Sequence, residues 1–238
     1  MDEKLDSKTI AGLLGLLAHD LRNPLSALHS NVGFLAATPE VDEADMRDAV
    51  SDALVSCDGL VAIIDNIELL AQSMVGAGIR GGGPVPVAAT IAQSVAGHRA
   101  MAESHEVLLE VDASATDTRL HIVVHQDMYR RAFANVLRNA IQHGAGKPVK
   151  IAASAADGEV RVVVIDQGSR LDVSLGDEPF TAAGQLSAKT KTGARYGRGL
   201  GLFSARFAAE SAGAKLLPVS PPRGANNALA LVAPGSRD

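Results

Sequence analysis

The residues best suited to chemistry in this chain of 238 residues lie around His19. A neutral imidazole is a competent nucleophile and can accept a phosphoryl group. Asp20 is its neighbour and could polarise the other ring nitrogen as an orienting base. Asn23 lies four residues further on, so a helix would place it one turn away on the same face, where its amide could hold a water in line with a phosphorylated partner. The segment predicts phosphoryl chemistry with catalytic roles for His19, Asp20 and Asn23.

A second group of polar residues lies between positions 135 and 143. Asn135 and Asn139 are one helical turn apart and share a face. An amide oxygen is a hard ligand that suits Mg²⁺ held between phosphates, so Asn139 is the expected metal ligand. Arg138 and His143 could approach the phosphates or could simply be solvated. Two asparagines on one helix face are also compatible with an ordinary surface.

A third feature is a glycine-rich segment ahead of a predicted helix. Glycines free the backbone amides to cradle phosphate, and the helix dipole adds attraction. The residues of this segment that we expect to bind a nucleotide are Gly197, Gly199, Leu200 and Gly201. The preceding loop carries Lys189 and Lys191, which could screen phosphate charge, although a solvated basic loop is an equal alternative.

The elements that must position these residues begin with two helices. Apolar residues recur at steps of four and three, which is typical of a heptad seam. The first seam is Leu14, Ala18, Leu21, Leu25, Leu28, Val32 and Leu35, and the second is Val50, Ala53, Cys57, Leu60, Ile64, Ile67, Ala71 and Met74. Pro39 separates them, because proline disfavours helix at the residue before it. Residues 1–75 therefore predict an antiparallel hairpin that dimerises into a four-helix bundle.

Beyond this hairpin the period changes. Residues 76–86 (GAGIRGGGPVP) are a linker by composition, and residues 87–238 are expected to form a second domain. Helices are predicted over 87–103, 127–143 and 200–212, and strands over 106–111, 119–124, 149–153, 160–165, 215–217 and 228–232. Asp157-Gly158 between two alternating runs indicates a β-hairpin. Residues 169–197 have no sustained period and read as a long functional loop. The fold class is α+β.

Composition limits the alternatives. The net charge of -5 argues against a general nucleic-acid binder. A single cysteine excludes an intramolecular disulfide and favours a reducing, cytoplasmic setting. No run reaches the ~20 apolar residues that span a bilayer, and the N-terminus is unlike a signal peptide, so no membrane insertion is expected. The sensor of a signalling protein of this kind is then expected in a separate protein, or the signal must reach these domains directly.

The run from His19 to Leu25 (HDLRNPL) resembles the H-box of the sensor histidine kinases of two-component systems at every position. The run from Asn135 to His143 looks like the N-box of the same family, and Gly197–Leu202 is similar to its G2 box. The resemblance implies phosphorylation at His19, Asp20 as helper base, and Asn23 as an aid to dephosphorylation of a response regulator. It also implies a dimeric phosphoacceptor hairpin followed by an ATP-binding α/β sandwich of the GHKL type, with a mixed, largely antiparallel sheet.

Two further boxes complete the resemblance. The run Val162–Gly168 (VVVIDQG) is similar to the G1 box, in which Asp166 would accept from the adenine amino group and Gly168 would let the base approach the backbone. Arg170 stands where the family has a second glycine, which departs from the pattern. Glu178-Pro179-Phe180 resembles an F-box. The boxes occur in family order and cover residues from about Ile10 to Ala233.

The predicted function is ATP- and Mg²⁺-dependent autophosphorylation of His19, followed by transfer to an aspartate of a response-regulator receiver domain. A phosphatase activity is compatible with the same residues. The first alternative is a histidine phosphotransferase or phosphatase with a degenerate ATP-binding domain, which Arg170 favours. The second is a non-catalytic GHKL regulator, against which the complete H-box argues. The signal and the net direction of the activity are not encoded in these motifs.

Overall fold

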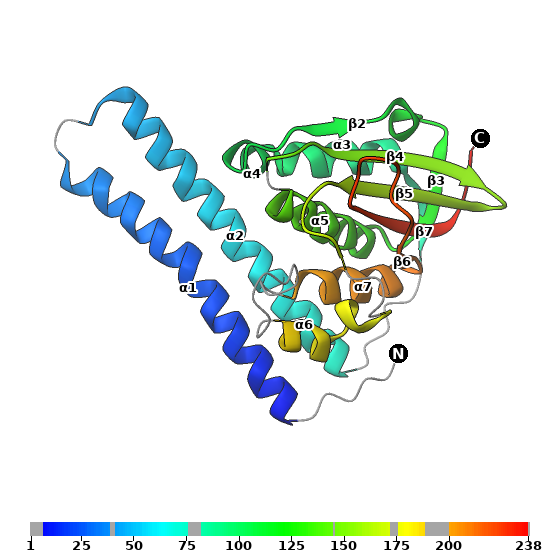
Figure 1. Cartoon of the computed structure of the whole chain (residues 1–238), viewed down its shortest axis with the longest axis horizontal. Coiled ribbons are helices and arrows are strands. Elements are labelled where there is room, and N and C mark those ends of the chain that lie inside the picture. Colours follow the sequence, from blue (N-terminus) through cyan, green and yellow to red (C-terminus); the bar gives the residue numbers. More distant parts are fainter. Residues whose placement is uncertain are drawn as a thin grey trace.

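The computed structural model describes residues 7–38, 41–75, 82–144, 146–171, 176–188 and 200–237. Helices α1 (Ser7–Ala37) and α2 (Glu43–Val75) form the predicted antiparallel hairpin, which projects from the rest of the chain (Figure 1). The Asp42 carboxylate caps α2, since it accepts from the amides of Ala44 and Asp45 at 2.8 and 2.9 Å. Pro39 and Glu40 lie outside the described residues.

The remaining elements form an α/β domain. In chain order they are β1 (Gly83–Pro86), α3 (Val87–Gly97), α4 (Arg99–Ser104), β2 (Leu109–Val111), the 3-10 helix η1 (Ala113–Thr116), β3 (Leu120–Val124), α5 (Gln126–His143), β4 (Val149–Ala156), β5 (Glu159–Asp166), the 3-10 helix η3 (Glu178–Phe180), α6 (Ala182–Ala188), α7 (Gly201–Ala212), β6 (Lys215–Pro218) and β7 (Asn227–Arg237). This arrangement confirms the predicted α+β class.

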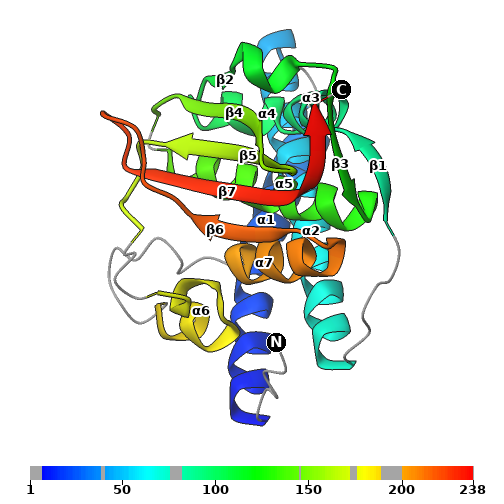
Figure 2. The same cartoon turned by 90° about the vertical axis from the view of Figure 1, so that its right-hand side faces the viewer.

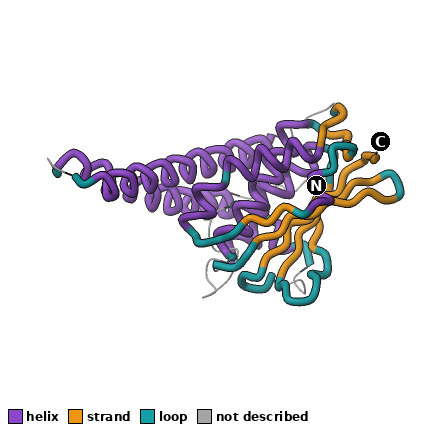
Figure 3. The backbone as a smooth tube through the Cα atoms, turned by 90° about the horizontal axis from the view of Figure 1, so that it is seen from above, coloured by secondary structure: helices purple, strands orange, loops and turns teal. Residues whose placement is uncertain are grey.

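The strands make one sheet in the order β1-β3-β7-β5-β4-β2, with β6 also paired to β7. The pairing of β2 with β4 is parallel and the others are antiparallel. Asp157 and Gly158 turn β4 into β5 with φ angles of 53° and 76°, as the sequence predicts for a tight hairpin. Helices cover one face of the sheet and leave the other open (Figures 2 and 3), and the alternating burial along β5 follows from this.

The core lies between the sheet and its helices. Its largest fully buried side chains include Phe133 and Leu137 of α5, Ile122 of β3 and Ile151 of β4. The α5 helix is amphipathic, so one face enters this core while the opposite face looks toward the hairpin. Polar residues on the face toward the hairpin can therefore line a site.

The base of the hairpin packs against the α/β domain. Leu69 of α2 joins the main core. A second apolar cluster joins hairpin residues to α6 and α7, and it contains Leu13, Leu16, Leu17, Leu70, Ala182, Leu200 and Phe203. Arg131 of α5 adds an ion pair with Glu68 of α2, with 3.0 Å between Nη2 and Oε2. The hairpin therefore packs against the α/β domain through both apolar and charged contacts.

Three local predictions need correction. The predicted linker ends early, because Gly83–Pro86 is an edge strand, where prolines are tolerated. The predicted helix over 87–103 divides at His98, whose ring Nδ1 bonds the Ser94 carbonyl at 2.7 Å. The predicted loop over 169–197 contains η3 and α6. The Thr181 hydroxyl accepts from the Gly184 amide at 3.0 Å and so starts α6.

Candidate functional site

A cavity of about 560 Å³ lies between the hairpin and the α/β domain. Helix α1 contributes His19, Asp20, Asn23 and Pro24, and α5 contributes Asn135, Arg138, Asn139 and Gln142. Gly201 borders the cavity at the start of α7, so the N-terminus of that helix opens on it. The fold thus brings the two polar groups of the sequence, more than 100 residues apart, to the walls of one space.

The predicted nucleophile is accessible. The His19 side chain is 55% exposed, and its Nδ1 lies 3.4 Å from Oδ1 of Asp20, which is a long contact. A proton on Nδ1 facing this carboxylate leaves the lone pair of Nε2 for attack. The other carboxylate oxygen of Asp20 is buried and accepts no hydrogen bond from the residues that the structure describes. The Asp20 side chain can therefore stabilise positive charge as it develops on the ring.

The two asparagines of α5 are buried but face the cavity. Asn135 is 5% exposed and Asn139 is 7% exposed. Nδ2 of Asn135 donates to the Arg131 carbonyl at 3.1 Å, which fixes the orientation of the amide. Its Oδ1 is buried and has no hydrogen-bond partner within the described ranges. An unpartnered amide oxygen beside a second asparagine fits Mg²⁺, which takes one or two protein oxygens together with phosphate oxygens.

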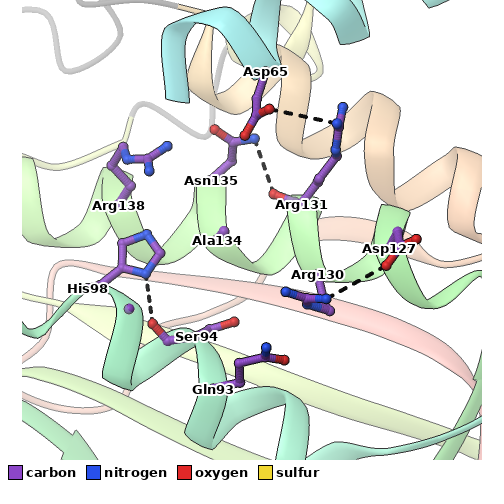
Figure 4. Close-up of a pocket in the computed structure, with 11 residues that line it drawn as sticks. Asp65, Gln93, Ser94, His98, Asp127, Arg130, Arg131, Ala134, Asn135 and Arg138 are labelled. Carbon is purple, nitrogen blue, oxygen red and sulfur yellow. Dashed lines mark hydrogen bonds and ion pairs between the residues drawn. The ribbon is translucent and has the colours of Figure 1, made fainter. Parts of the chain in front are cut away.

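Arg138 lies on the same helix and borders this cavity and a neighbouring one of about 420 Å³. Figure 4 shows the second cavity, with Arg138 and Asn135 above His98 of the α3–α4 junction. Burial lowers the pKa of the Arg138 guanidinium, while Asp65 and Asp58 of α2 oppose that shift. Burial also lowers the pKa of His98. Since arginine titrates far above neutral pH, Arg138 brings a positive charge to the site.

The predicted adenine-binding residues lie at the end of β5. Asp166 is 2% exposed, and its Oδ1 accepts from the Gly168 amide and from Nδ2 of Asn227, each at 2.9 Å. A Cβ on Gly168 would lie 1.7 Å from the His143 carbonyl oxygen, so the end of α5 itself requires glycine here. Arg170, the departure from the family pattern, is exposed.

Two residues that hold this loop were missed by the sequence reasoning. Nδ2 of Asn226 donates to the carbonyls of Gln167 and Gly168 at 3.0 and 2.9 Å. Asn227 is buried, donates to the Ser169 carbonyl at 3.0 Å and accepts from the Leu171 amide. The available signal was a polar pair, Asn226-Asn227, directly before an apolar strand.

The predicted site residues thus fall into four sets. His19, Asp20, Asn23, Asn135, Arg138, Asn139 and Gly201 line the first cavity. Asp166, Gly168 and His143 meet at the end of β5, and Leu200 is fully buried in the apolar cluster at the hairpin base. Lys189, Lys191, Gly197 and Gly199 lie outside the described residues.

Comparison with known families gives two matches in the same order. The family described as "His Kinase A (phospho-acceptor) domain" matches residues 11–74, and the one described as "Histidine kinase-, DNA gyrase B-, and HSP90-like ATPase" matches residues 124–231. The first range contains the hairpin with His19. The second contains α5, the end of β5 and the start of α7.

Individual relatives agree with these matches. A bacteriophytochrome of Pseudomonas aeruginosa is 27% identical over 84% of this chain and 26% of its own length. The sensor-type histidine kinase PrrB of Mycobacterium leprae is 27% identical over 91% of this chain and 46% of its own length. The chain therefore spans less than half the length of these curated relatives.

Solved structures show the same fold. Histidine kinase AdeS of Acinetobacter baumannii has a TM-score of 0.54 at 14% identity, over 91% of this chain and 97% of its own. Full-length ShkA, solved in complex with AMPPNP, has a TM-score of 0.57 at 20% identity, over 94% of this chain and 46% of its own.

A phosphoacceptor hairpin followed by a GHKL-type ATPase domain is the core of a histidine kinase. The chain belongs to the sensor histidine kinases of two-component systems. No helix in the described part of the chain is both long enough and apolar enough to cross a membrane.

Proposed function

We propose that this chain transfers the γ-phosphoryl group of ATP to His19 and then to an aspartate of a response-regulator receiver domain. The observation that carries the proposal is the shared cavity, in which the exposed His19 ring and the buried amides of Asn135 and Asn139 line one space. Phosphoryl transfer needs positioning and charge neutralisation more than covalent help from the protein.

The residues divide this work between them. Nε2 of His19 attacks the γ-phosphorus, the bond to the β-phosphate oxygen breaks, and ADP leaves. Asp20 holds the Nδ1 proton and stabilises the charge on the ring. The amide oxygens of Asn139 and Asn135 would hold Mg²⁺, which neutralises charge on the phosphates when bound. The Asp166 carboxylate would accept from the adenine amino group.

The hairpin also has a surface for a second copy. Several seam residues predicted from the sequence remain exposed in the single chain, and the large ones are Leu14, Leu25, Val32, Val50, Ile64 and Met74. Leu54 and Val61 are also exposed, at 61% and 57%. Apolar side chains that follow a seam along two long helices are typical of a helix-bundle interface. They support a homodimer held by α1 and α2.

The test of the reaction is incubation with γ-labelled ATP and Mg²⁺. The wild-type chain should acquire an acid-labile label, and His19→Gln should acquire none while still binding nucleotide. His29→Gln is the matched control, because His29 is exposed on the same helix but does not line the cavity. Acid-stable label on the His19→Gln chain would overturn the assignment.

The metal ligand is tested separately. Asn139→Ala should lose Mg²⁺-dependent labelling, because the amide oxygen is proposed to bind metal. If Asn139→Ala is labelled at the wild-type rate at saturating Mg²⁺, Asn139 lines the cavity but does not bind the metal.

Asn23 borders the cavity beside His19 and is proposed to act in the reverse direction. Its neutral amide can orient a water toward the acyl phosphate of a phosphorylated receiver. Asn23→Ala should therefore lose phosphatase activity and keep much of its autophosphorylation. Equal loss of both rates, or loss of neither, would remove Asn23 from the site.

A further inference from the structure

The hairpin has two chemically different sides. At about 100° per residue, Leu14, Leu25 and Val32 lie within about 20° of one another on α1. His19 lies about 140° and Asn23 about 180° from Leu14 on the same helix. The phosphoacceptor therefore faces away from the exposed apolar side of α1.

Helix α2 is divided in the same way. Val50, Leu54 and Val61 lie within about 40° of one another, whereas Gly59 and Asn66, which line the cavity, are about 160–180° from Val50. A second copy packed on the apolar side of both helices would leave the cavity side untouched. The cavity side of the hairpin is already covered by the α/β domain of its own chain.

A charged contact holds that domain in place. Arg131 of α5 reaches α2, where its Nη2 lies 3.0 Å from Oε2 of Glu68 and 3.7 Å from Oδ1 of Asp65. Figure 4 shows Arg131 pointing to Asp65 across the gap between the two helices. The Arg131 carbonyl also accepts from the Asn135 side chain, so this contact lies one turn from a proposed metal ligand.

We propose that Arg131, paired with Glu68 and Asp65, positions the ATP-binding domain on its own hairpin, so that His19 receives the phosphoryl group from the ATP site of the same chain. The inference rests on the function proposed above. Transfer between chains would need the domain to leave these contacts and the apolar cluster at the hairpin base. Arg131 is a positioning residue, because it acts through the placement of α5.

Charge reversal can show which chain supplies each partner. Glu68→Arg and Arg131→Glu should each slow labelling of His19 about fivefold, because attraction between half-exposed charges becomes repulsion. The double variant on one chain should return to within about twofold of wild type. Glu43→Arg is the matched control, since it breaks an exposed ion pair with Arg47 at the start of α2, and it should not change the rate.

The decisive sample mixes the two single variants, with different affinity tags, and isolates the mixed dimers. If docking occurs within one chain, the contact between α2 and α5 opposes two arginines in the Glu68→Arg chain and three acidic groups in the Arg131→Glu chain, so labelling should stay slow. Docking between chains would instead give an attractive pair at both contacts, since each α5 would meet a position 68 of opposite charge, and recovery of the rate would overturn the proposal. Failure of the double variant to recover would remove Arg131 from its positioning role.

A second mixture tests the route of the phosphoryl group directly. Dimers of one His19→Gln chain and one Asn139→Ala chain should stay unlabelled if transfer occurs within a chain, whereas label on the Asn139→Ala chain would show transfer between chains. If the chain proves monomeric, a labelling rate per chain independent of protein concentration supports the proposal, and a rate rising with concentration overturns it. Failure of the proposed function is distinct, because the wild-type chain itself would then acquire no acid-labile label.

Discussion

The hairpin and the ATP-binding domain bury their apolar residues in opposite ways. The domain encloses its own core, where Phe133 and Ile122 are fully buried, whereas the hairpin leaves Leu54 61% exposed. The site has the same contrast, since the hairpin supplies the accessible His19, the proposed nucleophile, and the domain supplies the buried amides of Asn135 and Asn139. Groups that must meet a partner lie on the hairpin, which is the open element because its apolar residues are exposed. Groups that must be held rigid lie on the ATP-binding domain, which is the closed element because its core is enclosed.

The largest expected effect is a core truncation in the closed element. Phe133→Ala should lower the free energy of unfolding of the ATP-binding domain by about 3–5 kcal/mol, because it removes a fully buried ring and leaves a cavity. Urea denaturation measures it. Leu54→Ala is the comparison, and below the dimerisation concentration it should cost less than about 1 kcal/mol. Similar costs for both would break the contrast between the two elements.

The next effect concerns the loop at the end of β5. Asn227→Ala should destabilise the domain by about 1–3 kcal/mol, because it removes the hydrogen bonds that Asn227 makes to the buried Asp166 carboxylate and the Leu171 amide. It should also weaken binding of ATP and ADP alike, since the Asp166 carboxylate loses a fixed hydrogen bond. Calorimetry with both nucleotides checks this. Unchanged affinity in a folded variant would mean that Asn227 supports the fold alone.

The open element is tested by charge on its apolar side. Leu54→Lys should weaken the homodimer at least about tenfold, because two lysines would be buried in a symmetric interface. Sedimentation equilibrium measures the change, and Ser51→Lys on the exposed surface of the same helix is the control. A dimer unaffected by Leu54→Lys would place the interface elsewhere.

The smallest expected effect is a pH dependence. Burial lowers the pKa of His98 in the folded chain below the ordinary value of 6.5. Between this lowered pKa and pH 6.5, the unfolded chain therefore binds more protons than the folded chain. The contribution of His98 to stability should therefore be complete above pH 6.5 and decline as the pH falls toward its lowered pKa. His98→Gln should flatten this part of the stability profile relative to the wild-type chain. An unchanged slope in the variant would contradict the assignment.

Periodicity and motif order were enough to predict the hairpin, the α+β domain and the grouping of polar residues on α5. The sequence could not show that Gly83–Pro86 pairs with β3, because its glycine and prolines read locally as a linker. It could not identify Asn227, because the fold brings this residue to Asp166 across 61 positions of chain. It also could not place His19 beside the α5 of its own chain, since that depends on packing at the hairpin base rather than on local pattern.

Helix α5 carries both the contact to the hairpin, at Arg131, and the proposed metal ligands one and two turns further on. Two binding events that share one rigid helix are thermodynamically linked, and the coupling free energy is the same in both directions. If bound ATP strengthens the packing of α5 against the hairpin, that packing strengthens the affinity for ATP by the same factor. A rotation of α2 that moves Glu68 away from Arg131 would then lower the affinity for ATP, although it changes no residue that contacts the nucleotide. Titration of Glu68→Arg with ATP should show this loss, and Glu43→Arg should not.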